Sequence, residues 1–320
     1  MKNEEIKILS ELPQEFRKFK INQIEGGASK KILYRINEGL NSYVVISFIK
    51  DKNEYINYVK IYNYLKDFNI SIPKIISKND RMLFIICEDF GNLRFDKILK
   101  QYSVKKLLKL AVDTLIYIKN TAKDNNKIKL KKYKFDTFQT EIKELPDYYL
   151  PYVRIQNIEL NYEFLEIWSK SFKNISFEFD SFVHKDFNLN NLIFLPSLKK
   201  HMQCGVLDFQ NAFLGESCWD LFSLLEDSRI LFLDEYNEDF IQYYYQKTNI
   251  KIPLAEFKLK YYFLNCARQT RLLGRWVKLA TTLNQLEYLK YISITKKRLK
   301  KSINFLDNKE IINFYYKYIL

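Results

Sequence analysis

Residues 182–227 read FVHKDFNLNNLIFLPSLKKHMQCGVLDFQNAFLGESCWDLFSLLED. Two short apolar runs, LIFL at 192–195 and CGVLDF at 204–209, lie on either side of a polar turn, and this pattern predicts a β-hairpin. One histidine, His184, and the acids and amide Asp186, Asn191, Asp208 and Asp220 gather at the edges of these runs. The stretch therefore predicts a polar site built around a hairpin.

The order of these residues favours metal-assisted phosphoryl transfer. Magnesium prefers hard oxygen ligands and typically takes one or two carboxylates together with phosphate oxygens and water. In such a reaction Asp186 would take or orient the acceptor hydroxyl, while Asn191 and Asp208 would hold metal across the phosphates. Taken singly, Asp186 and Asn191 could cap a turn and Asp208 could pair with a lysine, so the inference depends on all of them together.

The first ninety residues predict a small sheet with one helix. A loop with Gly26 and Gly27 leads into a strand-like stretch, and a turn at Gly39 leads into the β-rich run at 43–49. Apolar residues at helical spacing predict a helix over 53–69, and MLFIICEDF at 82–90 predicts a buried strand. We expect an N-terminal lobe at 1–90.

The remainder, 91–320, predicts a larger and mostly helical lobe. Residues 103–120 place apolar side chains on one face after a Ser103 N-cap. Further helices are expected at about 160–174, 234–247, 254–280 and 285–306. Since the chain has only seven glycines, each is expected where the backbone needs a positive φ or a close approach.

The charge balance first raises the possibility of a nucleic-acid partner. The 320 residues contain 52 Lys+Arg and 38 Asp+Glu, which gives a net charge of +14. Clustered cations gain affinity for nucleic acid or anionic membranes by releasing counterions. Here the lysines are spread along the chain, apart from a dense run at 127–134, as in a sequence shaped by AT-rich codons. We expect no nucleic-acid partner, although a nucleic-acid binder stays as an alternative that charge alone supports.

Cysteine spacing and the absence of long apolar runs predict a cytoplasmic protein. The four cysteines are far apart and form no metal-binding or disulfide pattern, as expected of a reduced chain. No signal-peptide pattern is present, and no apolar run approaches the roughly 18 residues of a membrane span. We expect no membrane partner and a monomer.

These motifs resemble those of a known family. HxDxxxxN at 184–191, DFQ at 208–210 and the further Asp220 are similar to the aminoglycoside phosphotransferase branch of the kinase superfamily. Within it, CGVLDFQ resembles the bacterial N-acetylmuramate/N-acetylglucosamine 1-kinases of peptidoglycan recycling. GGASKKILYRI, IPKII, ICEDFGNLRF and NCARQTRLLGRW also look like that family, so the resemblance covers nearly the whole chain.

The resemblance implies an α+β, two-lobed protein-kinase-like fold that uses ATP and Mg²⁺. It implies that Asp186 is catalytic, that Asn191 and Asp208 bind metal, and that His184 and Asp220 support the loop. The residues that it places at the nucleotide are Gly26, Gly27, Ala28, Ser29 and Lys31 in the covering loop, and Glu88, Asp89 and Phe90 at the hinge.

One position departs from the protein-kinase pattern. Protein kinases carry a lysine on the third strand, whereas residues 44–47 here are Val-Val-Ile-Ser. The same lysine is missing from the sugar-kinase family, so its absence speaks against a protein kinase. The phosphate contact could instead come from Lys30, Lys31 or Lys50.

The acceptor site is expected on a long helix near the C-terminus. Arg268, Arg271 and Arg275 share one helix face and could bind a carboxylate such as the lactyl group of N-acetylmuramate. The alternative is a solvated or internally paired basic face. Trp219 and Trp276 could stack on a sugar or pack in the core.

The sequence thus predicts an enzyme that transfers phosphate from ATP to the anomeric hydroxyl of N-acetylmuramate or N-acetylglucosamine. A kinase of another small acceptor, such as an aminoglycoside, choline or a homoserine-like compound, would share every motif. A pseudokinase binding module is a further alternative, which the missing strand lysine alone supports.

Overall fold

The computed structural model describes residues 10–24, 31–122, 128–230 and 234–320. Its contacts divide the described chain into two compact units. The first comprises the residues up to Thr114 together with Leu189–Ala212, and the second comprises Leu115–Asn188 and Phe213–Leu320. These contact-based units do not test the predicted boundary between lobes at residue 90, which stays a prediction.

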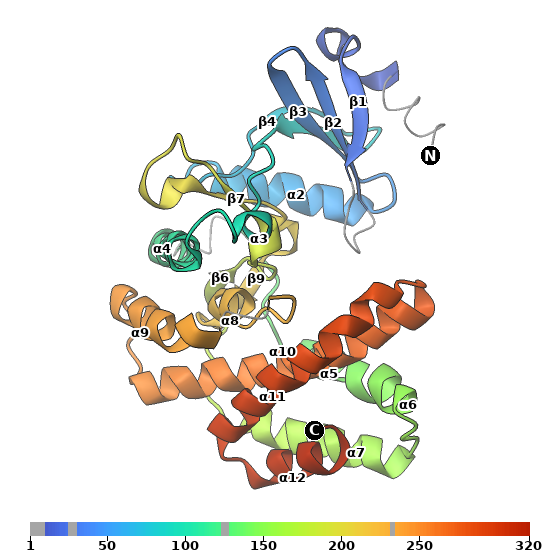
Figure 1. Ribbon diagram of the computed structural model, residues 1–320, viewed down its shortest axis with the longest axis vertical. Helices are drawn as coiled ribbons and strands as arrows, with labels where there is room; N and C mark the ends of the chain where they lie inside the picture. Colours follow the sequence, from blue (N-terminus) through green and yellow to red (C-terminus); the bar gives the residue numbers. More distant parts are fainter. Residues whose placement is uncertain (1–9, 25–30, 123–127, 231–233) are drawn as a thin grey trace. The chain divides into compact units, whose positions relative to one another are not determined.

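A five-stranded antiparallel sheet forms the centre of the first unit (Figure 1). Its strands, in spatial order, are β1 (Lys20–Ile24), β2 (Ile32–Glu38), β3 (Asn41–Ser47), β5 (Phe84–Glu88) and β4 (Ile75–Asn79). Tyr34, Ile36 and Val45 on β2 and β3 are almost fully buried, and they form one core with Phe84 and Ile86 of β5. Alternating side chains thus bury one face of the sheet.

Helix α2 (Lys52–Leu65) packs against the sheet through aromatic side chains. Its N-cap is Asp51, whose carboxylate accepts a hydrogen bond from the Glu54 backbone N–H at 3.1 Å. Rings of Tyr55 and Tyr58 lie 5.8 and 5.5 Å from the ring of Phe48, which follows β3. The predicted helix is confirmed, and its buried face fixes it on the sheet.

The predicted hairpin is confirmed as β7 (Leu192–Phe194) and β8 (Cys204–Val206). It joins the first unit through backbone hydrogen bonds from Val206 to Ser71 and from Phe194 to Leu93, both 2.7 Å long. Gly205 is required here, because a Cβ at this position would come within 2.7 Å of the Phe90 ring. The hairpin is thereby held against the segment that follows β5.

The second unit is mostly helical and contains one two-stranded sheet, β6 (Ser181–Val183) with β9 (Phe213–Gly215). Helix α4 (Val104–Thr121) runs from the first unit into the second. The other α-helices of the described residues are α3 (Phe95–Ile98) in the first unit and, in the second, α5 (Phe135–Ile142), α6 (Leu150–Tyr152), α7 (Ile158–Lys173), α8 (Trp219–Leu225), α9 (Asn237–Lys247), α10 (Leu254–Thr282), α11 (Ile292–Leu306) and α12 (Lys309–Tyr318). Across the described ranges, no helix combines the length and the apolar character needed to cross a bilayer.

The long helix α10 packs against α5, α8 and α11 (Figure 1). Gly274 allows this packing, because a Cβ at 274 would overlap the backbone carbonyl group of Glu144. Glu144 lies just before a π-helical turn, Leu145–Tyr149, that follows α5. The absence of a side chain at 274 thus brings α10 into direct contact with the backbone of that segment.

The single helix predicted over 285–306 is divided in two. A 3₁₀ segment, Leu286–Tyr291, precedes α11. Residues three apart point the same way in 3₁₀ winding, and the rings of Tyr288 and Tyr291 both pack on Trp276, 5.5 and 5.3 Å from its ring. Packing on one indole therefore favours the tighter winding.

Candidate active site

The loop that carries Asp186 is held by hydrogen bonds within the second unit. Backbone N–H groups of His184 and Lys185 donate to the Asp220 carboxylate at 2.7 and 3.0 Å. The Asn188 side-chain amide donates to the backbone carbonyl of Asp186 at 2.9 Å. Lys185 adopts a positive φ of 83°. The backbone on both sides of Asp186 is thus fixed independently of any substrate.

Asp220, in the first turn of α8, is the buried partner of this loop. The pKa of Asp220 is raised to about 7, because burial and, to a smaller extent, the charge of Asp186 raise it more than the two backbone hydrogen bonds lower it. His184 is also buried, and its ring meets that of Phe187 edge-on at 5.7 Å. These contacts are those expected of residues that support a loop.

Asn191 and Asp208 lie at one end of the hairpin in the first unit. The backbone N–H of Leu207 donates to the Asn191 carbonyl at 2.9 Å, which continues the β7–β8 register by one pair. Asp208 is therefore the next residue after the partner of Asn191, and it adopts a left-handed conformation with φ 66°. The two predicted metal ligands thus come from directly paired chain segments.

The Asp208 carboxylate is contacted by one residue distant in sequence, Lys31, and by the nearby Gln210. The Lys31 ammonium contacts it, and the Gln210 amide donates to it at 2.9 Å. The same Gln210 amide donates to Glu54 of α2 at 2.8 Å. We call Lys31, Glu54, Asp208 and Gln210 the Asp208 cluster. Glu54 was not predicted, because a single acid in the first turn of a helix is already explained by its favourable interaction with the helix N-terminus.

The alternative positions for the phosphate-binding lysine can now be compared. Lys31 directly precedes β2, where its ammonium reaches Asp208. Lys50 is exposed after β3. Lys30 lies outside the described residues, as do Gly26, Gly27, Ala28 and Ser29 of the predicted covering loop. Of the three lysines considered, Lys31 is thus joined to a predicted metal ligand.

The donors at the hairpin end fit a magnesium ion. Asn191 supplies an amide oxygen and Asp208 a carboxylate. In the described part of the chain, no three acidic, histidine or cysteine side chains form a metal cage. Magnesium that binds through phosphate oxygens needs only one or two protein carboxylates. This donor set therefore suits a metal that arrives with a nucleotide.

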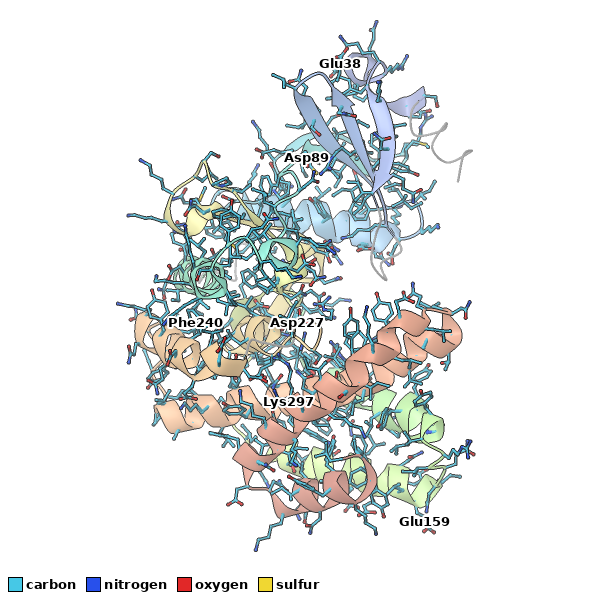
Figure 2. The ribbon with its side chains drawn as sticks, viewed as in Figure 1. Glu38, Asp89, Glu159, Asp227, Phe240 and Lys297 are labelled. Atoms are coloured by element: carbon cyan, nitrogen blue, oxygen red, sulfur yellow. The ribbon has the colours of Figure 1, made fainter. Side chains whose placement is uncertain are left out.

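The predicted hinge residues have separate roles in the structure. The Asp89 carboxylate accepts hydrogen bonds from Arg35 at 3.0 Å, Ser42 at 2.6 Å and the Gly91 backbone at 2.9 Å (Figure 2). Burial raises the pKa of Asp89, but these donors lower it more, and it lies below its ordinary value. Glu88 is exposed at the end of β5. The side chain of Asp89 thus organises the turn after β5.

Phe90 is the hinge residue that contacts another element of the predicted nucleotide site. It is partly buried, and its ring lies against Gly205 of β8. The ring thus lies beside the hairpin that ends in Asp208.

Arg268 and Arg271 line a small pocket in the second unit. Its other lining residues are Tyr133, Glu141, Ile142, Trp219, Leu264 and Ala267. Arg271 donates to Glu141 at 2.7 Å, and Tyr133 donates to the other oxygen of Glu141 at 2.9 Å. Burial alone would lower the pKa of Arg271, yet Glu141 and Asp186 hold it above its ordinary value.

The remaining members of the predicted acceptor face have structural partners. Arg275 donates to both oxygens of Glu144, at 2.8 and 2.5 Å. Trp276 donates to the Thr295 hydroxyl at 2.9 Å and stacks on Tyr288, so its core-packing alternative is confirmed. Trp219 is 4% exposed and packs among aromatic rings at the edge of the pocket.

An ion pair that the sequence did not reveal lies after α8. Arg229 donates to both oxygens of Asp227, with both distances 2.8 Å (Figure 2). Burial would raise the pKa of Asp227, but the charge and hydrogen bonds of Arg229 lower it below its ordinary value. The carboxylate of Asp186 raises the pKa of Arg229, as it does for Arg268 and Arg271. Asp186 is thus near three guanidinium groups.

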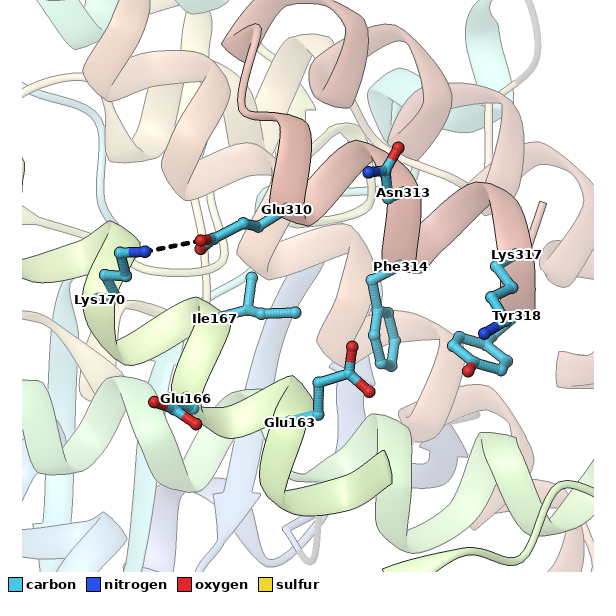
Figure 3. Close-up of a pocket in the computed structure, with 9 residues that line it drawn as sticks. All are labelled: Glu163, Glu166, Ile167, Lys170, Glu310, Asn313, Phe314, Lys317 and Tyr318. Atoms are coloured by element: carbon cyan, nitrogen blue, oxygen red, sulfur yellow. Dashed lines mark hydrogen bonds and ion pairs between the residues drawn. The ribbon is translucent and has the colours of Figure 1, made fainter. Parts of the chain in front are cut away.

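A larger pocket in the second unit contains none of the predicted site residues (Figure 3). It lies between α7 and α12 and is lined by Glu163, Glu166, Ile167, Lys170, Glu310, Asn313, Phe314, Lys317 and Tyr318. Lys170 and Glu310 close one end with an ion pair of 2.6 Å. Its charged rim has no donor set or nucleophile that links it to phosphoryl transfer.

A family model described as "Phosphotransferase enzyme family" matches residues 20–251, which is most of the chain. The chain belongs to the phosphotransferase enzyme family. The matched range includes Lys31, Asp186 and Asp208, and it ends before α10. The match thus covers the Asp208 cluster and the Asp186 loop, whereas Arg268 and Arg271 lie beyond it.

Individual members of this phosphotransferase family show further similarity. The chain is 24% identical to an N-acetylmuramate/N-acetylglucosamine kinase of Neisseria meningitidis over 75% of this chain and 72% of that protein. It is 25% identical to a protein of the same name from Pseudomonas aeruginosa, over 63% and 58% of the two chains. The second alignment thus spans less than two thirds of the relative.

The same fold occurs in a solved GDP complex of an aminoglycoside 2′-phosphotransferase-IIIa variant. That structure matches 96% of this chain and 98% of its own chain with a TM-score of 0.65 and 12% identity. The small antiparallel sheet with α2 and the larger helical part confirm the predicted two-lobed, protein-kinase-like α+β fold. At such identity, the likeness concerns the fold alone.

Proposed function

We propose that this phosphotransferase is an ATP-dependent kinase of an N-acetylated amino sugar, N-acetylmuramate or N-acetylglucosamine. The observation that carries the choice of acceptor is the similarity to kinases of that name over up to 75% of the chain. The product would be the sugar 1-phosphate, formed on the anomeric hydroxyl. A role in peptidoglycan recycling in the cytoplasm would follow from that product.

In this proposal the first unit supplies the nucleotide side of the reaction. The N-terminal lobe, residues 1–90, would bind ATP with the covering loop and the hinge segment 88–90. Lys31 would contact the phosphates, and Asn191 and Asp208 would hold Mg²⁺. When bound, that ion neutralises charge on the phosphates. The contact between Lys31 and Asp208 supports an active kinase over a pseudokinase, because it provides the cation that β3 lacks.

Asp186 would act on the acceptor. Its carboxylate accepts the hydrogen bond of the sugar hydroxyl, orients the oxygen and takes the proton as the new O–P bond forms. The bond from the γ-phosphorus to the β-bridging oxygen breaks, and ADP leaves. Because the loop is fixed through Asp220, the carboxylate needs little reorganisation, so positioning and charge stabilisation supply the rate enhancement.

The test is ADP formation by the purified chain across a panel of hydroxyl acceptors. The panel contains both N-acetylated sugars, an aminoglycoside, choline and homoserine. We expect turnover with the sugars and product that loses its phosphate under mild acid, as a sugar 1-phosphate does. Turnover of another member with indifference to both sugars would reject the proposed acceptor. Absence of ADP formation with every acceptor would favour the alternative of a catalytically inactive pseudokinase that only binds its ligands.

A further inference from the structure

Asp186 is near more guanidinium groups than have an ion-paired acid. Arg229, Arg268 and Arg271 are all close enough to Asp186 for its charge to act on them. Two of the three have a dedicated carboxylate. Arg229 is paired with Asp227 and Arg271 with Glu141. The third, Arg268, has no ion pair among the described residues.

Each oxygen of the two partner carboxylates already accepts a hydrogen bond. Both oxygens of Asp227 accept hydrogen bonds from the side chain of Arg229. In Glu141, one oxygen accepts from Arg271 and the other from the Tyr133 hydroxyl. Arg268 would therefore have to share an oxygen that already accepts from another donor.

Arg268 is partly buried. Its Nη1 is buried and has no hydrogen-bond acceptor within the described ranges. The pKa of Arg268 is lowered to about 10. Burial is the main cause, and the charges of Arg271 and Arg229 add to it, while Asp227 and Asp186 oppose it. A buried guanidinium nitrogen without an acceptor is costly for the folded state, so its presence beside a pocket favours an anion as its partner.

We propose that Arg268 binds a carboxylate on the acceptor, so that this enzyme selects hydroxyl compounds that also carry an acid. This inference rests on the proposed kinase function and goes beyond it by naming the charge of the preferred acceptor. The guanidinium presents parallel N–H groups that match a carboxylate, and Trp219, Leu264 and Ala267 limit competing water. An uncharged acceptor would leave the guanidinium unsatisfied.

The experiment compares acceptors that differ by one acid. N-acetylmuramate carries a lactyl carboxylate that N-acetylglucosamine lacks, and D-glucuronate and D-glucose form a second pair. We expect the wild-type chain to have the higher kcat/KM for the acidic member. In Arg268→Gln the acid-to-neutral ratio of kcat/KM should fall by about 10- to 100-fold, the value of a hydrogen bond to a charged group.

Two further variants separate recognition from folding. Arg268→Lys keeps the charge without the planar fork, and it should recover part of the ratio. Arg275→Gln removes a guanidinium from the same helix face whose partner is Glu144, and the ratio should stay at the wild-type value. Thermal midpoints of all variants report on folding.

Other outcomes would overturn the inference. An unchanged ratio in Arg268→Gln would show that Arg268 does not bind the acid. A raised KM for ATP with an unchanged ratio would assign Arg268 to a nucleotide phosphate. If neither N-acetylated sugar is a substrate, the proposed function fails, and the acceptor that does react decides this inference separately. An acidic acceptor supports it, and a neutral or cationic one contradicts it.

Discussion

The Asp208 cluster of the first unit and the guanidinium groups of the second unit balance their charges differently. In the Asp208 cluster one cation, Lys31, contacts Asp208, while the amide of Gln210 connects Asp208 to Glu54. Of the three guanidinium groups near Asp186, two are ion-paired and Arg268 is not. The first group is rich in negative oxygen, as suits a ligand that arrives with metal. The guanidinium groups near Asp186 include one unpaired positive charge, as suits an anionic ligand that arrives without metal.

This difference teaches that the two units can be tested separately. A change in the second unit should alter the handling of the acceptor, and a change in the Asp208 cluster should alter the handling of the nucleotide. The predictions below test that separation and begin with the largest expected effect.

Asp186→Asn should lower kcat by about 10³-fold, because the amide cannot take the hydroxyl proton. The backbone hydrogen bonds of the loop do not use the Asp186 side chain, so the variant should fold and bind ATP as the wild type does. ADP release gives kcat, and calorimetric titration gives ATP affinity. Asp147→Asn, an exposed acid in the same unit, is the matched control. Near-normal turnover of Asp186→Asn would remove Asp186 from the mechanism.

Lys31→Met should lower kcat/KM for ATP by about 100-fold, the order expected when one preorganised charge on a phosphate is lost. The acid-to-neutral acceptor ratio should be unaffected, since Arg268 belongs to the other unit. Lys50→Met provides the control, because Lys50 is exposed in the same unit. If both variants lose activity equally, the phosphate contact cannot be assigned to Lys31.

Asp220 predicts a pH dependence of stability. Its pKa is about 7 in the folded chain and ordinarily 3.8, so between about pH 4 and 7 the folded state binds more protons than the unfolded state. The free energy of unfolding should therefore decrease as pH rises through this window, by up to about 1.4 kcal/mol per pH unit from this group. Denaturant titrations of wild type and Asp220→Asn between pH 5 and 8 measure it. Equal slopes in the two proteins would contradict the shift.

Much of the fold could be predicted because its elements have clear periodicity or turn signals. The helices α2, α4, α7, α9 and α10 follow repeated apolar positions, and the hairpin follows two apolar runs around a polar turn. Scarcity also made the glycines informative, since Gly39 and Gly91 have positive φ and the other described glycines lie against neighbouring groups. The segment 135–152 gave no such signal, because Pro146 and Pro151 interrupt its short helices.

The candidate site was predictable where its residues are close in sequence. Asp186, Asn191 and Asp208 form one motif within a short stretch. Glu54 could not be found, because its contact with Gln210 joins residues that are 156 positions apart. The pairing of Arg271 with Glu141 and the lack of a partner for Arg268 likewise depend on how helices meet, which spacing along a single helix cannot reveal.

The contact at Gly274 connects helix packing to acceptor choice. Gly274 lies within one turn of Arg271, and the backbone that it touches at Glu144 is one turn from Glu141, the partner of that arginine. Any side chain at 274 would force the two segments apart and so change which carboxylate reaches which guanidinium. A position without a functional group of its own would thus influence substrate selectivity. Substitutions of Gly274 would be limited by their effect on catalysis as well as by their effect on stability.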